Sequence, residues 1–155
     1  MKHGRIGLIS DTHGLMRAEA LAALEGSELI IHAGDIGNVD VLDSLSQIAP
    51  VLAIRGNNDR GPWAKGMADV LKLRVNGVKL QVIHNVHGIE GGPTERNMAV
   101  VISGHSHRPG VVKRDEILFV NPGSAGPRRF KLPVSVARMN LAENRLRAVI
   151  VELKI

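Results

Sequence analysis

The strongest constraint on this chain is a pattern that occurs three times within its first 60 residues. Each time, a short apolar run ends in a cluster of acidic, amide or imidazole side chains, and the three runs span residues 6–9, 29–33 and 51–54. Two segments with apolar residues at helical spacing, 18–24 and 39–48, separate these runs. Apolar runs without polar alternation are typical of parallel strands that are covered on both faces. The pattern therefore predicts an α/β fold built on a parallel sheet.

The polar clusters follow the carboxyl ends of the predicted strands, where open α/β sheets bind ligands. Asp11 and His13 come after the first strand, Asp35 after the second and Asn57 after the third. Alternate residues of an extended chain point to the same side, so Asp11 and His13 can face one cavity and chelate a cation. Taken alone, such an Asp-x-His pair is more often an Asx-type turn with an exposed histidine. The repeated clusters favour the metal site.

The second half of the chain consists mainly of short strand-like segments and turns, without the alternation of strands and helices seen in the first half. Residues 70–75 and 78–83 are strand-like, and the Asn-Gly pair between them is a strong hairpin signal. Further strands are predicted at 100–103, 117–120, 134–139 and 145–153, with a short helix at 94–98. We expect these segments to form a second, mostly antiparallel sheet packed against the first. His84 and the Gly-His-Ser-His run at 104–107 again lie at predicted strand ends.

Length and composition narrow the class of protein. A chain of 155 residues with 44% hydrophobic residues fits one domain spanning 1–155. Aromatic residues make up only 2%, which argues against a module that binds single-stranded nucleic acid by stacking. The absence of cysteine excludes disulfides, thiolate metal sites and cysteine nucleophiles. The net charge of +5 would attract an anionic substrate or nucleic acid. Since no apolar run approaches the length of about 18 residues needed to span a membrane, we expect no membrane segment and a cytoplasmic location.

The strand-end side chains form one set of potential metal ligands. They are Asp11, His13, Asp35, Asn57, His84, His105 and His107. Imidazole and carboxylate ligands suit divalent Mn, Fe, Ni, Co or Zn, whereas Mg²⁺ prefers oxygen ligands throughout. Seven ligands exceed what one ion needs if it also leaves room for substrate. Two ions that share a carboxylate, the usual arrangement for displacement at phosphorus, are therefore expected.

These motifs give the chain a family resemblance. Asp-x-His, Gly-Asp, Gly-Asn-x-Asp, a strand-end His and Gly-His-x-His follow one another as in the calcineurin-like metallophosphoesterases, and the short length and the Asn-Pro-Gly-Ser segment at 121–124 are most similar to the small YfcE-type members. The resemblance implies a four-layer α/β/β/α sandwich of two mixed sheets flanked by helices. It also implies phosphoester hydrolysis, with a preference for diesters, in which a hydroxide that bridges the two metals attacks phosphorus.

The resemblance also implies a role for each ligand. Asp11, His13 and His107 would hold the first metal, Asp35 would bridge the two, and Asn57, His84 and His105 would hold the second. Asp35, Asn57 and His107 are the residues we expect to act in catalysis. We expect manganese in preference to Ni, Fe, Co or Zn, a small phosphoester substrate, and a homo-oligomeric protein, either a dimer or a tetramer.

Two positions depart from the family pattern. Asn58 stands where many larger members have the histidine that protonates the leaving group, and an amide has no titratable proton to give. Small YfcE-type proteins also tend to lack that histidine. In the fourth cluster, the family's strand-end His is normally followed by Gly, whereas here His84 is followed by Asn and His87 by Gly. We favour His84 as the ligand because loop geometry beyond a strand is less fixed, and His87 stays open as a ligand, a proton donor or an exposed histidine.

Other polar residues have less specific signals. His32 is predicted to be structural, and Ser124 is predicted to be a turn residue because no base is near it in sequence. Of the adjacent Arg128 and Arg129, at most one can face a phosphate, and both could equally belong to a solvated surface. Arg55 and Arg60 flank the third cluster and have the same two interpretations.

Two other function classes stay open at this point. One is a non-catalytic protein-binding scaffold, as in the retromer subunit that resembles this family, but a scaffold is free to lose metal ligands and this chain has a competent residue at each position. The other is a nuclease or nucleic-acid binder, which would need a groove or capping domain for which 155 residues leave little room.

Overall fold

The computed structural model describes residues 4–88, 97–142 and 145–155. The strands of the first half are β1 (Arg5–Ile9), β2 (Leu29–His32), β3 (Val51–Ala53), β4 (Val70–Val75) and β5 (Val78–Ile83). Those of the second half are β6 (Met98–Ile102), β7 (Gly110–Arg114), β8 (Ile117–Asn121), β9 (Ser135–Ala142) and β10 (Arg145–Glu152). The helices are α1 (Ala18–Leu24) and α2 (Val39–Ser46), with single 3-10 turns at η1 (Pro62–Ala64) and η2 (Val86–Gly88). Across these ranges, no helix combines the length and the apolar character needed to cross a membrane.

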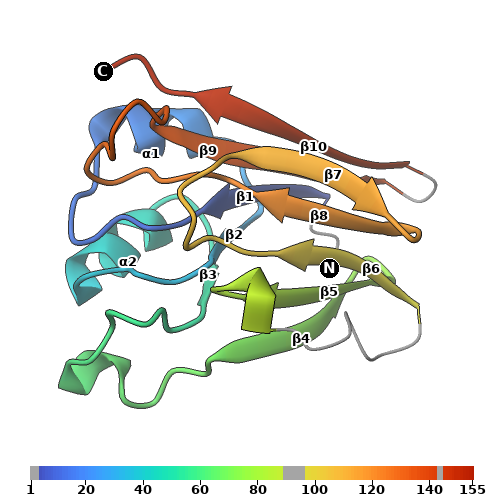
Figure 1. Cartoon of the computed structure of the whole chain (residues 1–155), viewed down its shortest axis with the longest axis horizontal. Coiled ribbons are helices and arrows are strands. Elements are labelled where there is room, and N and C mark those ends of the chain that lie inside the picture. The colour runs from blue at the N-terminus through green and yellow to red at the C-terminus, as the bar shows by residue number, and fades with distance from the viewer. Residues whose placement is uncertain (1–3, 89–96, 143–144) are drawn as a thin grey trace.

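The strands form two five-stranded sheets, and both are mixed (Figure 1). The first has the order β10-β9-β1-β2-β3, in which β1, β2 and β3 are parallel and β9 is antiparallel to both of its neighbours. The second has the order β4-β5-β6-β8-β7, with parallel pairs in the centre and an antiparallel pair at each edge. The prediction of an α/β fold with two mixed sheets is confirmed.

Three details of the predicted second half are wrong. The second sheet is not mostly antiparallel, since two of its four strand pairs are parallel. The strands predicted at 134–139 and 145–153 belong instead to the first sheet, where β9 covers the edge of β1 that the parallel strands leave open. Met98 was expected to end a helix but begins β6, while residues 94–96 of that predicted helix lie outside the described ranges. Strand β7 was not predicted, because four of its five residues are exposed and show no apolar alternation.

Two apolar layers hold the structure together. Side chains such as Leu8, Ile31 and Leu80 fill the space between the sheets, and all three are fully buried. Helices α1 and α2 pack on the outer face of the first sheet through Leu24 and Leu45. Because successive strand residues point to opposite faces, β1 contributes alternately to both layers. Among the described residues, α-helices cover only this outer face.

The direction of the parallel strands positions the functional loops. The arrowheads of β1, β6 and β8 point to the left in Figure 1, and β2, β3 and β5 run parallel to one or another of them. The loops that follow the parallel strands of both sheets therefore meet at one edge of the sandwich.

Candidate metal centre

Six of the seven predicted ligands form two groups at this edge. They come from the loops after four different strands: Asp11 and His13 follow β1, Asp35 follows β2, His84 follows β5, and His105 and His107 follow β6. The structure arranges them as two groups of three, Asp11 with His13 and His107, and Asp35 with His84 and His105. Within each group, the potential ligand atoms lie within 4.8 Å of one another.

The backbone of these loops is strained at the ligands themselves. The φ angles of Asp11, His13, Asp35, His105 and His107 are all between 47° and 70°, in the left-handed region that L-residues rarely occupy. Each such residue costs on the order of 1–3 kcal/mol and persists only where its surroundings fix it. Here the fixing contacts join the two ligand loops, since the Asp11 and His13 N–H groups donate to the carbonyls of Gly34 and Asp35 at 3.0 Å each. Strain at five potential ligands indicates that the required direction of the side chains determines the conformation of these loops, at the expense of the preferred backbone angles.

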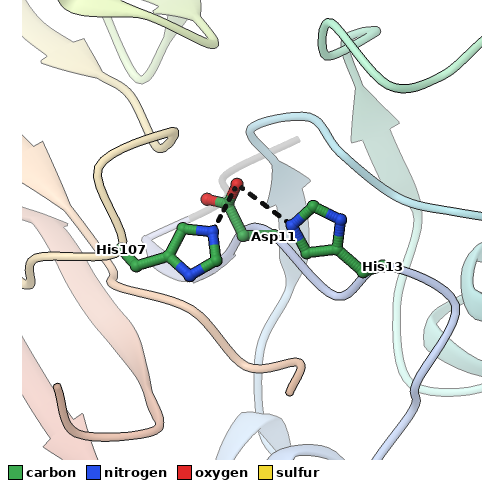
Figure 2. Close-up of side chains that lie close together, drawn as sticks. All are labelled: Asp11, His13 and His107. Atoms are coloured by element: carbon green, nitrogen blue, oxygen red, sulfur yellow. Dashed lines mark ion pairs between the residues drawn. The ribbon is translucent and has the colours of Figure 1, made fainter. Parts of the chain in front are cut away.

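In the first group, the Asp11 carboxylate lies between two imidazoles (Figure 2). Its Oδ1 is 3.8 Å from His13 Nε2 and 3.4 Å from His107 Nε2. Its other oxygen, Oδ2, is fixed by the Ser10 hydroxyl at 2.7 Å and by the His105 N–H at 3.0 Å. Burial alone would raise the pKa of Asp11, but the neighbouring His107 and His84 imidazoles and Ser10 outweigh it and lower that pKa below its ordinary value.

In the second group, His84 is oriented by a backbone carbonyl. Its Nδ1 lies 2.7 Å from the carbonyl oxygen of Ala33, which can only accept, so Nδ1 carries a proton and donates it. The other nitrogen, Nε2, therefore faces the carboxylates, at 3.2 Å from Asp35 Oδ2 and 3.7 Å from Asp11 Oδ1. A carbonyl on the far nitrogen is the usual way to orient a metal-binding histidine.

The acid–base pairing of this group follows from burial and contact. Burial acts to lower the pKa of His84, yet its contacts with Asp35, the Ala33 carbonyl and Asp11 raise it above its ordinary value. Burial acts to raise the pKa of Asp35, but His84, the Asn58 N–H and His13 lower it to about 2. Protons on imidazole thus balance the buried carboxylates. A divalent cation would displace them, because metal ligands bind in their deprotonated forms.

The donor set and its unsatisfied atoms fit divalent metal ions. Asp11 Oδ1, His13 Nε2 and His84 Nε2 are buried and have no hydrogen-bond partner within the part of the chain that the structure describes. Buried polar atoms are nearly always paired, so three that converge in one place need an explanation. Nitrogen and oxygen donors without sulfur suit borderline transition metals.

The loop after β3 supplies contacts that the sequence did not reveal. Asn58 holds both oxygens of Asp35, its N–H donating to Oδ1 at 3.0 Å and its side-chain amide to Oδ2 at 3.2 Å. Asp59 is buried and accepts three backbone N–H groups, those of Ile36, Gly37 and Gly56, at 2.9 to 3.0 Å. It thereby ties the loop after β3 to the loop that carries Asp35. Asp59 is the acid that ends the Gly-Asn-x-Asp motif, and this position was the only signal in the sequence for its role. The sequence analysis predicted no function for it.

Asn57 is the predicted ligand that lies outside the two groups of carboxylates and imidazoles. Its side chain is exposed and makes no hydrogen bond to the described residues. Its neighbours nevertheless touch Asp35: Asn58 hydrogen-bonds it, and a Cβ on Gly56 would lie 2.2 Å from the Asp35 N and Oδ1 atoms. Asn57 therefore stands on a loop that packs directly against the second group.

The remaining candidates lie outside the two groups. His87 is exposed in η2, where its N–H donates to the Asn85 side chain at 3.1 Å. Arg55 is ion-paired with Asp69 at 2.9 Å, and Arg60 donates to the Asn57 carbonyl at 3.4 Å. Arg128 and Arg129 are exposed on the connection between β8 and β9.

Two polar residues predicted to be structural do support the ligand loops. The Ser124 hydroxyl donates to the Asp11 carbonyl at 2.9 Å. His32 is fully buried and accepts the Gly34 N–H at Nδ1, so its proton is on Nε2 and is donated to the Thr12 hydroxyl at 3.0 Å. That hydroxyl donates in turn to the Ile36 carbonyl at 2.8 Å. The chain links the loops after β1 and β2.

Comparison with known proteins decides the family. The sequence profile of the calcineurin-like phosphoesterase superfamily domain matches residues 5–144. The chain belongs to this superfamily. It is 33% identical over 162 residues to a probable metallophosphoesterase of Methanocaldococcus jannaschii, with 96% of this chain and 81% of the relative covered. The resemblance inferred from the motifs is thus confirmed, and membership makes the chain a phosphoesterase, a hydrolase with a metal-binding site typical of dinuclear metallophosphoesterases.

Solved structures show the same fold. An archaeal phosphodiesterase is similar with a TM-score of 0.78 at 23% identity, covering 95% of this chain and 99% of that chain. Vacuolar protein sorting 29 from Cryptosporidium parvum has a TM-score of 0.73 at 15% identity, covering 98% of both chains. A phosphodiesterase and a vacuolar protein sorting protein share this fold, so the fold by itself does not establish an activity.

The buried His32 generates a pH prediction. Its burial lowers the pKa to about 4, against 6.5 in the unfolded chain. The unfolded chain takes up this proton first, so the contribution to stability is complete above pH 6.5 and is lost as the pH falls toward 4, by on the order of 3 kcal/mol. Urea unfolding between pH 7 and 4.5 should show this loss in the wild-type protein and in His87→Gln, but a flatter profile in His32→Gln, whose amide can keep both hydrogen bonds. Equal profiles in all three proteins would show that His32 does not cause the loss.

Proposed function

We propose that the chain is a metal-dependent phosphodiesterase that uses two divalent ions. The observation that carries this proposal is that the two ligand groups adjoin each other, with side chains of one group within 4 Å of side chains of the other. His13 Nε2, from the first group, lies 3.8 Å from Asp11 Oδ1 and 3.9 Å from Asp35 Oδ2, and His84 Nε2, from the second, lies 3.7 and 3.2 Å from the same two atoms. Asp35 is thus close to an imidazole of each group, which supports its role as the shared carboxylate.

The proposed ligands divide as the family pattern implies. Asp11, His13 and His107 hold the first ion, Asn57, His84 and His105 hold the second, and Asp35 holds both. When bound, such ions supply Lewis-acid activation of water and neutralise charge on the phosphoryl oxygens. The chain's own task is to fix the ligands, and Asn58 does so for Asp35 by hydrogen-bonding both of its oxygens. Asp35, Asn57 and His107 are the residues we propose to contact the reacting group.

A diester preference agrees with the archaeal phosphodiesterase of similar fold. The scaffold alternative is less well supported, because a scaffold needs no converging, unsatisfied ligand atoms. A nuclease is not favoured, since the two sheets and their loops use nearly all of the chain. Manganese is the proposed metal, with Ni, Fe, Co or Zn as alternatives. We also propose a single domain over 1–155, a dimer or tetramer, and a cytoplasmic location.

The test of the proposed function is removal of the shared carboxylate. Asp35→Asn should lose both metals and nearly all hydrolysis of an aryl phosphodiester, because each ion loses a charged ligand. Elemental analysis and turnover with added Mn or Ni measure the two effects. Asp43→Asn, which changes an exposed acid on α2, is the control and should keep both. Two metals and near-normal rates in Asp35→Asn would show that Asp35 does not bridge.

A second prediction concerns the fourth cluster. His84→Ala should lose metal and activity, because His84 is buried with Nε2 facing both carboxylates. His87→Ala should keep its metal, because His87 is exposed on η2. Metal content of the two purified variants, measured side by side, decides the assignment. Loss of metal in His87→Ala alone would reverse it.

A third prediction follows from Asn58. Without a general acid, worth about 10² to 10⁴ in rate, hydrolysis should slow steeply as the pKa of the leaving alcohol rises. Asn58→His should rescue poor leaving groups selectively, and Asn58→Ala controls for the lost hydrogen bond to Asp35. The measurement is turnover of a series of aryl and alkyl diesters under conditions where chemistry limits the rate. A flat dependence in the wild-type protein would mean that another group, with His87 first in line, already supplies the proton.

A further inference from the structure

A loop beside the metal centre displays an aromatic ring to solvent. We call residues 127–133, Pro-Arg-Arg-Phe-Lys-Leu-Pro, the basic loop. Its Phe130 is 89% exposed, in a chain that has only two phenylalanines, one tryptophan and no tyrosine. An exposed phenylalanine forgoes the stabilisation that burial of its ring would bring. Its position therefore calls for a reason other than packing.

The backbone at Phe130 is strained as well. Its φ angle is 53°, in the left-handed region that bulky side chains avoid. The Leu132 N–H donates to the Arg129 carbonyl at 3.1 Å and closes a turn with Phe130 at its tip. A proline at each end of the loop fixes a further φ angle. The turn therefore holds Phe130 in a backbone conformation that a bulky side chain does not favour.

The fold places the basic loop at the edge that carries the metal ligands. Strand β8 ends at that edge and the antiparallel β9 begins there, so their connection runs along it (orange, left side of Figure 1). Gly126 packs on the ligand loop itself, since a Cβ there would lie 2.5 Å from the Asp11 carbonyl and 2.4 Å from that of Thr12. Phe130 is four positions after Gly126, so their Cα atoms are at most about 14 Å apart. The basic loop thus begins beside the loop that carries Asp11 and His13.

The charged residues that flank the ring in the sequence are all positive. Arg128, Arg129 and Lys131 flank Phe130 in sequence and are exposed. None of the three makes an ion pair with the residues that the structure describes. An apolar ring among unpaired cations suits a ligand that combines a flat π-surface with negative charge. An uncharged apolar protein surface would gain nothing from three cations.

On the basis of the proposed phosphodiesterase activity, we propose that Phe130 and its flanking cations form the subsite for the nucleoside of a nucleotidyl phosphodiester. The base stacks on Phe130 while the diester lies at the metals and the cations attract its phosphates. In the reaction, water supplies the oxygen that bonds to phosphorus, one P–O ester bond breaks, and the leaving alcohol keeps the bridging oxygen and gains a proton. One exposed ring provides a platform for one base, so the low aromatic content does not conflict with this site.

The test compares two substrates with one leaving group. Thymidine 5′-(p-nitrophenyl phosphate) and methyl p-nitrophenyl phosphate release the same p-nitrophenolate and differ in the nucleoside. Phe130→Ala should raise KM for the thymidine ester about 5- to 150-fold, the range that corresponds to the loss of one stacked base. The KM for the methyl ester and kcat for both should change little. Phe130→Trp should keep the difference in KM between the two esters. The matched control is Phe119→Leu, which changes the chain's other phenylalanine, on β8, and should leave KM for both esters unchanged.

Several outcomes would overturn the proposal. No change in Phe130→Ala, or an equal change for both esters, would exclude base recognition by this ring. A fall from oligomer to monomer in light scattering, with discrimination intact, would make Phe130 an interface residue instead. One platform predicts that Phe130→Ala weakens binding of a dinucleotide and of a ten-nucleotide single strand equally. A much larger loss for the ten-nucleotide strand would make the basic loop part of a nucleic-acid binding surface instead.

The design separates failure of this inference from failure of the proposed function. Binding of thymidine 5′-monophosphate to the wild-type protein and to Phe130→Ala, measured by calorimetry, needs no turnover. If the wild-type protein hydrolyses neither ester but binds the nucleotide in a Phe130-dependent way, the subsite stands and the phosphodiesterase proposal fails. If it hydrolyses both esters and binds the nucleotide equally with and without the ring, the subsite fails alone.

Discussion

The structure depends on the burial of two carboxylates in one place. Asp11 and Asp35 are 0% and 3% exposed, and each is within 4 Å of the same two imidazole nitrogens. Two buried negative charges so close together are tolerable only if cations lie between them. The His84 imidazole, whose pKa is raised, can serve in the metal-free protein, and divalent ions in the loaded one. The same arrangement thus explains the lowered pKa values of both acids, the raised pKa of His84 and the affinity for metal.

The surrounding hydrogen bonds hold the ligand loops in shapes that they would not adopt alone. Five ligands have left-handed backbone angles, and the fully buried Thr12 and His32 and the nearly buried Asp59 lie behind them. Asp59 accepts hydrogen bonds from three backbone N–H groups, while the His32–Thr12 hydrogen bond joins the loops after β1 and β2. None of these three residues faces the metal groups directly. Their contribution is to make the ligand geometry rigid before any ion or substrate arrives, which is how a site achieves precise positioning.

The sequence predicted the parts of the structure that local pattern determines. Helix α1 and the hairpin of β4 and β5 have the predicted bounds, because apolar spacing and the Asn-Gly turn act within a few residues. Six ligands could be found because strand ends converge whenever parallel strands share a sheet. The partners of β9 could not be predicted, since an alternating strand fits the edge of either sheet. Edge strand β7 gave no burial signal. The contacts of Asn58 and Asp59 depend on how loops 23 residues apart in sequence approach each other, which no local pattern encodes.

The missing proton donor and the basic loop bear on the same barrier, and their magnitudes can be compared. A general acid contributes about 10² to 10⁴ in rate, which is about 3–5 kcal/mol of transition-state stabilisation. One stacked base contributes about 1–3 kcal/mol, and only the part realised in the transition state can raise kcat. Stacking on Phe130 therefore cannot replace an acid at position 58. If Phe130 stacks as proposed, it would lower KM for nucleotidyl substrates, whereas the leaving group would still depart by its own acidity or with help from a bound ion. The two proposals thus assign specificity to the connection between β8 and β9 and leave proton transfer to the substrate's own leaving group.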